Sequence, residues 1–152
     1  MNSYTNEFLI DTLTQKLYDA ITTKQGLTKW WTEESEIYLH IGGIATFHFG
    51  QDTHTVMKIS KLVPNKEVVW KCVEQHSPRK DTDIADEWVG TTIRFSIKED
   101  IDGKVKLFFT HEGLTSDLFC YEDCKNEWDY FLKSLETYLE TGKGKPYIHA
   151  DK

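Results

Sequence analysis

The chain has 152 residues with 39% hydrophobic and 28% charged residues, which is typical of one globular domain spanning residues 1–152. Its 25 acidic residues outnumber 18 basic ones, so we expect no nucleic-acid binding, which needs a basic face. No apolar run approaches the roughly 20 residues of a membrane helix, and the N-terminus has no signal-peptide pattern, so we expect no membrane insertion.

The N-terminal part of the chain predicts a strand followed by two helical segments. Residues 7–11 form a short apolar run that is typical of a strand. Thr12 is expected to cap the next helix, with Gln15 as its capping-box partner. A second short helix is expected over 25–31, ending in a Trp pair. The spacing i, i+4, i+7, i+8 predicts a buried stripe on the first helix, consisting of Leu13, Leu17, Ala20 and Ile21.

Five later runs alternate apolar and polar residues with a period of two. One face of each run is much more apolar than the other, which predicts an antiparallel sheet packed on one side. Asp102 and Gly103 predict a hairpin turn between the last two strands. The apolar face carries Ala45, Phe47, Phe49, Met57, Ile59, Val68, Trp70, Cys72, Ile93, Phe95, Ile97, Val105, Leu107 and Phe109.

The longest irregular stretch, 76–90, contains Pro78 and four acidic residues. A loop of this length in a small domain is functional or mobile, and we expect it to act as a lid anchored by Trp88. The final helix is predicted over 121–141, with Gly142 as its stop. A helix laid across the apolar face of a sheet gives a two-layer α+β fold.

Four stretches share a further pattern: Leu27-Thr28-Lys29-Trp30-Trp31-Thr32, 87–92, 111–114, and the Trp128–Leu135 repeat followed by 142–147. Their order and spacing resemble START-like (SRPBCC) domains, in the branch homologous to the activator of the heat-shock-protein-90 ATPase. The resemblance implies a helix-grip fold, in which a curved antiparallel sheet of six or seven strands wraps around the C-terminal helix. Such domains hold an apolar cavity, and members bind lipids, sterols or polyketides, catalyse cyclisation, or act as co-chaperones.

We therefore expect the chain to bind a small hydrophobic ligand, such as a lipid, polyketide or aromatic metabolite, without catalysis and without a cofactor. The cavity is expected between the sheet and the C-terminal helix, with Leu27 and Trp31 near one end. Strand alternation and the resemblance together predict the cavity wall as Trp31, Phe47, Phe49, Met57, Trp70, Trp88, Phe95, Phe109, Trp128 and Phe131.

Two other functions stay open. One is a co-chaperone-like role with a chaperone partner. The other is a cyclase or hydrolase that uses Glu74 and His111, which are in phase with the inward residues of their strands. A carboxylate and an imidazole in an apolar pocket can exchange protons at neutral pH, whereas a phase slip at the strand ends would place both at the solvated rim. The oligomeric state stays open between a monomer and a homodimer.

The cysteines and histidines do not predict a metal site. Cys120 and Cys124 are one helical turn apart, but no further ligand lies near them, so we expect buried thiols. Cys72 is expected in the core, and the histidines lack metal-ligand spacing. Three cysteines in a chain that is poor in them indicate free thiols and a cytoplasmic location.

Overall fold

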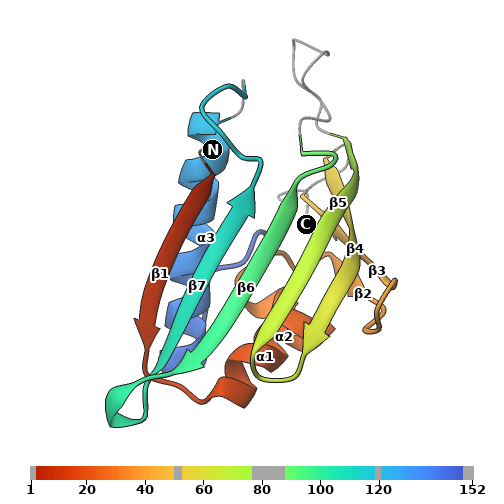
Figure 1. Cartoon of the computed structure of the whole chain (residues 1–152). Coiled ribbons are helices and arrows are strands. Elements are labelled where there is room, and N and C mark those ends of the chain that lie inside the picture. The colour runs from red at the N-terminus through yellow and green to blue at the C-terminus, as the bar shows by residue number, and fades with distance from the viewer. Residues whose placement is uncertain (1–2, 50–52, 77–87, 119–120, 149–152) are drawn as a thin grey trace.

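Seven antiparallel strands form one sheet in the order β1-β7-β6-β5-β4-β3-β2 (Figure 1). The computed structural model describes residues 3–49, 53–76, 88–118 and 121–148. The sheet curves around a long C-terminal helix, which confirms the predicted helix-grip architecture of the α+β class. The strands are β1 (Tyr4–Ile10), β2 (Ser35–Ile37), β3 (Ile44–His48), β4 (His54–Val63), β5 (Glu67–His76), β6 (Thr92–Glu99) and β7 (Val105–Glu112).

The helices cover one face of this sheet. α1 (Thr14–Thr22) and α2 (Lys24–Trp30) lie across one end of it, and α3 (Tyr121–Thr141) runs along β1 and β7 in Figure 1. The short helix η2 (Ile101–Gly103) turns the chain between β6 and β7, as the hairpin signal predicts. α3 has its predicted bounds, and Gly142 ends it with a φ of +87°. α3 therefore lies nearer to the β1 edge of the sheet than to the β2 edge.

The start of α1 differs from the prediction. The helix begins at Thr14 with Leu13 at the N-cap position, and no side chain caps it. The Thr12 hydroxyl is buried without a hydrogen-bond partner in the described part of the chain, so the predicted capping box is wrong. Leu13 is 61% exposed because it precedes the helix on extended backbone, and the buried stripe is therefore shorter than predicted. The next helix, α2, is capped by a side chain, because the Thr23 hydroxyl accepts the Gly26 N–H at 3.0 Å.

Large rings fill the core between the sheet and α3. The Phe109 ring lies 4.5 Å from Trp128 and 5.2 Å from Phe95, measured between ring centroids. Trp70 meets Phe95 edge-on at 5.1 Å, so the contacts run continuously across neighbouring strands. Edge-to-face pairs of this kind add roughly 0.5–1.5 kcal/mol each beyond the burial of apolar area. The predicted apolar face of the sheet is thus the core face.

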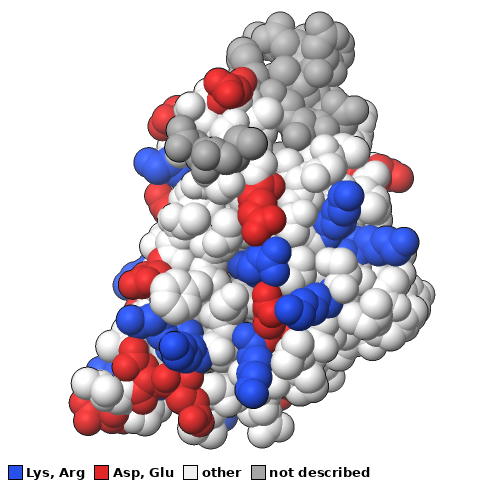
Figure 2. Space-filling model, in the orientation of Figure 1, with Lys and Arg blue, Asp and Glu red and all other residues white. Residues whose placement is uncertain are grey.

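The other face of the sheet is polar. Figure 2 views the molecule from this side and shows basic and acidic side chains interspersed over the strands. Arg94 on β6 bonds Glu67 on β5 at 2.9 Å and Glu112 on β7 at 3.2 Å, which links three strands by charge. The hydrogen bonds from Lys61 and Arg94 lower the pKa of Glu67.

None of the described helices is long and apolar enough to cross a membrane.

Two bulges interrupt the pairing of β4 with β5. The register passes from Met57–Cys72 directly to Val56–Glu74, which leaves Val73 without a partner residue on β4. An extra residue in one strand reverses which side chains point to each face beyond it. From this bulge to the end of β5, the odd-numbered Gln75 therefore takes the inward position that Glu74 would have held.

Candidate functional site

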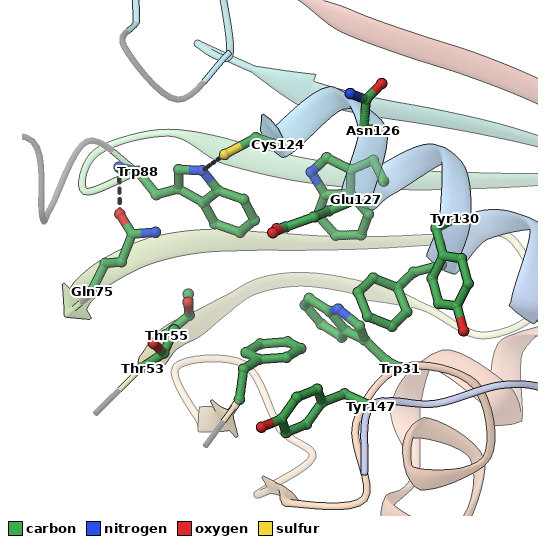
Figure 3. Close-up of a pocket in the computed structure, with 13 residues that line it drawn as sticks. Trp31, Thr53, Thr55, Gln75, Trp88, Cys124, Asn126, Glu127, Tyr130 and Tyr147 are labelled. Atoms are coloured by element: carbon green, nitrogen blue, oxygen red, sulfur yellow. Dashed lines mark hydrogen bonds between the residues drawn. The ribbon is translucent and has the colours of Figure 1, made fainter. Parts of the chain in front are cut away.

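A pocket of about 510 Å³ lies between the N-terminal half of α3 and the strand ends of β3, β4 and β5 (Figure 3). Seven aromatic residues form most of its described wall: Trp31, Phe49, Trp88, Trp128, Tyr130, Phe131 and Tyr147. The remaining described wall is contributed by Thr53, Thr55, Gln75, Cys124, Asn126 and Glu127. The pocket is thus mostly aromatic, with hydroxyl, amide and carboxyl groups among the rings.

Trp31 occupies the centre of the space between the sheet and α3. Its ring lies parallel to Trp70 at a centroid distance of 6.0 Å and lies 5.3 Å from Trp128. The backbone N–H of Trp31 bonds the Leu27 carbonyl at 3.0 Å and so closes the last turn of α2. Because this ring stands between Trp70 and Trp128, the space beneath the middle of the sheet is filled, and the pocket lies towards the strand ends.

The ten residues predicted for the cavity wall divide into two groups. Five of them line the pocket: Trp31, Phe49, Trp88, Trp128 and Phe131. The other five are fully buried in the core and are not part of the pocket wall: Phe47, Met57, Trp70, Phe95 and Phe109. Half of the expected set therefore lines this pocket, and the Trp31 ring packs on Phe47 and Trp70 between them and the pocket. Leu27 is also fully buried rather than at the pocket.

Trp88 forms the pocket wall next to β5. Its backbone N–H donates to the Gln75 side-chain oxygen at 2.8 Å, and its indole N–H donates to the Cys124 sulfur at 3.3 Å. The ring stacks on Trp128 at 5.8 Å with an interplanar angle of 11°. These contacts join β5, Trp88 and α3 around one side of the pocket (Figure 3). Residues 77–87, the greater part of the predicted lid, lie outside the described residues.

His111 lies behind this wall and is fully buried. Its Nδ1 accepts the Trp128 indole N–H at 3.1 Å, and its Nε2 lies 2.8 Å from the Thr91 hydroxyl oxygen. Burial lowers the pKa of His111 from 6.5 to about 3, so the imidazole is neutral at physiological pH. The predicted inward orientation of His111 is thus confirmed, although the residue is not among those that line the pocket.

Glu74 does not join His111. Its side chain is 63% exposed on the outer face, where a carboxylate oxygen lies 2.8 Å from His54 Nε2. The bulge at Val73 turns Glu74 outward, so the predicted inward orientation of this carboxylate is wrong. The two residues of the expected catalytic pair therefore lie on opposite faces of the sheet.

The two described cysteines, Cys72 and Cys124, are buried. Burial raises the pKa of Cys72 to about 12, as expected for a thiol in the core. Cys124 lies at the pocket wall, whereas Cys120 lies outside the described residues. Among the side chains that the structure describes, no three His, Cys, Asp or Glu are grouped to hold a metal ion.

Sequence reasoning missed three kinds of wall residue. Gln75 needs the bulge at Val73, and sequence alternation gives no sign of an extra residue in a strand. Tyr147 reaches the pocket only because the chain after α3 pairs with Thr32, which is far away in sequence. Tyr130 and Glu127 are on α3, and their place on the pocket wall depends on how this helix sits against the sheet.

A curved antiparallel sheet closed around a long C-terminal helix, with an aromatic pocket between them, defines a helix-grip protein of the SRPBCC superfamily. Within it, the chain belongs to the family described as "Activator of Hsp90 ATPase homolog 1-like protein", whose model matches residues 11–140. The resemblance seen in the sequence is thereby confirmed.

Solved structures agree with this assignment. The Aha1 dimer from Colwellia psychrerythraea is 30% identical, with a TM-score of 0.78, over 95% of this chain and 100% of that one. An HSP90 activator from Plasmodium falciparum is 18% identical, with a TM-score of 0.68, over 90% and 95%. CalU16 from Micromonospora echinospora is 14% identical, with a TM-score of 0.71, over 94% and 76%. Among curated proteins, none matches the sequence significantly.

Proposed function

We propose that this chain binds a small hydrophobic molecule, preferably an aromatic one, in the pocket between α3 and the ends of β3 to β5. The observation that carries the proposal is the ring of seven aromatic side chains around a space of about 510 Å³. This volume lies within the few hundred cubic ångströms of small-ligand sites, which are mostly apolar with a few polar groups. Aromatic walls offer flat faces on which a planar ligand can stack.

The polar residues favour a ligand with oxygen or nitrogen substituents. Thr53 and Thr55 carry hydroxyls that can donate or accept, and both line the β4 side of the pocket. The Gln75 oxygen holds Trp88, while its amide nitrogen keeps two donor hydrogens. A lipid tail would leave these groups without partners, whereas an aromatic metabolite or polyketide with carbonyl or hydroxyl groups would satisfy them.

The proposal is binding rather than catalysis. The neutral His111 imidazole contacts both Thr91 and Trp128, and Glu74 lies on the outer face. A base and an acid that cannot reach the same ligand do not support a cyclase or hydrolase mechanism by this pair. The low cysteine content, three residues in 152, supports placing this binding activity in the cytoplasm, where disulfides are rare.

An environment-sensitive dye tests the proposal. 6-Propionyl-2-dimethylaminonaphthalene is neutral and aromatic and carries a carbonyl, so we expect it to bind with a blue-shifted emission and to quench Trp fluorescence. Phe131→Asp places a charge on the pocket wall and should weaken binding strongly, whereas Lys133→Asp on the exposed side of α3 should not. Failure of the folded wild type to bind this dye or any aromatic competitor would refute the proposal. If the dye binds, native mass spectrometry of protein purified from its own host can identify the natural ligand.

A co-chaperone-like role is the second candidate, and family membership favours it. The turn between β2 and β3 also exposes apolar side chains, with Tyr38 70% and Ile41 60% exposed. The experiment is stimulation of the ATPase of the host's own heat-shock protein 90 by wild type and by Tyr38→Asp. No stimulation by the wild type would exclude this role.

Because the Colwellia psychrerythraea relative is described as a dimer, we also propose that this chain forms a homodimer, which light scattering can test.

A further inference from the structure

The chain after α3 returns to the pocket along a defined path. Beyond Gly142 it runs beside the residues that follow α2 and forms a parallel bridge between Thr32 and Tyr147. The Tyr147 N–H donates to the Trp31 carbonyl at 2.7 Å, and the Tyr147 carbonyl accepts the Glu33 N–H at 3.1 Å. We call residues 143–147 the C-terminal strap. Its last residue is therefore held by backbone hydrogen bonds on both sides.

A second attachment fixes the middle of the strap to α3. The Ser134 hydroxyl donates to the Trp30 carbonyl at 2.8 Å and accepts the Lys145 N–H at 2.7 Å. Gly144 passes so close that a Cβ there would lie 2.5 Å from the Lys29 carbonyl oxygen and 3.0 Å from the Ser134 carbonyl oxygen. These distances are too short for any side chain, so the path requires glycine at this position. One buried serine thus joins α2, α3 and the strap.

The two attachments act on two walls of the pocket. The strap and Ser134 bind the carbonyls of Trp31 and Trp30, which fixes the backbone that carries the Trp31 ring. They also fix Tyr147, whose ring meets Phe49 edge-on at 5.8 Å. In Figure 3, Tyr147 lies across the pocket from Trp88. The strap therefore forms the side of the pocket opposite Trp88.

We propose that the strap is a rigid end wall and that Tyr147 is the residue that limits the length of the ligand. This inference rests on the proposed binding function and adds a substrate class: compact aromatic molecules with short substituents, not aromatic molecules with long alkyl chains. The backbone that carries this ring cannot move away from the pocket without breaking the hydrogen bonds at Trp31 and Glu33, and the ring packs on Phe49. A ligand that extends past this ring would meet it sterically, which is how a pocket excludes longer homologues.

The test uses one fluorophore with chains of different length. The propionyl, hexanoyl and nonanoyl forms of 6-acyl-2-dimethylaminonaphthalene share the aromatic body and the carbonyl. The wild type should bind the propionyl form best and the nonanoyl form worst. Tyr147→Ala should improve binding of the nonanoyl form relative to the propionyl form by roughly tenfold, the range expected when a few methylene groups gain room. Tyr147→Phe keeps the ring and should keep the wild-type preference.

Loosening the strap without changing the pocket wall provides the second arm. Ser134→Ala removes both of its hydrogen bonds and should relax chain-length discrimination, although Ser134 does not line the pocket. Thr137→Ala, at a half-buried position on the same helix that also does not line the pocket, is the matched control and should leave discrimination unchanged. If the propionyl form binds but Tyr147→Ala and Ser134→Ala keep the wild-type ratio, the strap inference is wrong and the binding function stands. If no probe binds the folded wild type, the binding function fails and the inference falls with it.

Discussion

The Trp128 indole N–H donates to His111 Nδ1 at 3.1 Å, and this bond determines the state of the imidazole. Because Nδ1 accepts, Nε2 must carry the hydrogen and donate to the Thr91 hydroxyl at 2.8 Å. The Thr91 hydroxyl in turn donates to the Trp88 carbonyl at 2.6 Å. One buried histidine thus connects the Trp128 indole to the Trp88 backbone through Thr91, and it does so only while it is neutral.

This arrangement predicts a specific pH dependence of stability. Burial lowers the pKa of His111 to about 3 in the folded protein, whereas an unfolded chain protonates near 6.5. Between these values the unfolded state binds more protons, so stability falls as the pH falls, by about 1.4 kcal/mol per pH unit. His111→Gln should remove this contribution to the pH dependence of the free energy of unfolding. Urea denaturation at pH values between about 3 and 6.5 measures it. His40→Gln, at an exposed position, should leave the slope unchanged, and equal slopes in all three proteins would contradict the assignment.

Trp128 should be among the most costly residues to truncate. It is 2% exposed, contacts Phe109 of the sheet and Trp31 at the end of α2, and supplies the donor to His111. Trp128→Ala should lower the free energy of unfolding by about 3–5 kcal/mol, as other large-to-small core changes do. Tyr130→Ala, two residues away and 52% exposed, should change it by less than about 0.5 kcal/mol. A denaturant midpoint for Trp128→Ala near that of the wild type would rule out the central position of this ring.

The fold could be predicted because its signals are local and repeated. The alternation around Phe95 and Phe109 defines the core face of two strands, and the stripe through Trp128 and Leu132 defines the core side of α3. The start of α1 was mispredicted because a capping box is a short pattern. Thr12 and Gln15 match that pattern, yet the helix begins only at Thr14 and no side chain caps it.

The pocket could be predicted only in part, because its position depends on contacts between distant segments. The sequence shows which rings are inward but not that Trp31 enters between Trp70 and Trp128 and fills the central space. It also cannot show the inserted residue Val73, which exchanges the faces of Glu74 and Gln75. Tyr147 follows a helix stop and has no local pattern that places it on the pocket wall.

The bulge at Val73 can be tested by comparing substitutions of Glu74 and Gln75, the two residues that follow it. Gln75 lines the pocket and holds the Trp88 backbone, whereas Glu74 is exposed on the outer face. Gln75→Ala should therefore weaken binding of the propionyl dye by roughly five- to tenfold. The change removes a wall residue and leaves the Trp88 backbone N–H without its acceptor. Glu74→Ala should leave the dye affinity within about twofold of the wild type, because it removes only an exposed hydrogen bond with His54 on the outer face. The reverse order of effects, measured by fluorescence titration, would show that β5 has no bulge at this point.

The thiols give an independent measure of where a ligand sits. All three cysteines should titrate as free thiols in denaturant without reductant, and a count of one would reveal a disulfide and argue against a cytoplasmic location. In the folded protein Cys72 should be unreactive, because burial raises its pKa to about 12 and the thiolate is the reactive form.

Cys124 lies at the pocket wall, so a small alkylating reagent should reach it through the pocket, and a Cys120→Ser background isolates its signal. With the propionyl dye at about ten times its dissociation constant, alkylation of Cys124 should slow by roughly tenfold, as mass action requires. Mass spectrometry of the alkylated peptides measures both rates, and an unchanged Cys124 rate with the dye bound would place the dye outside this pocket.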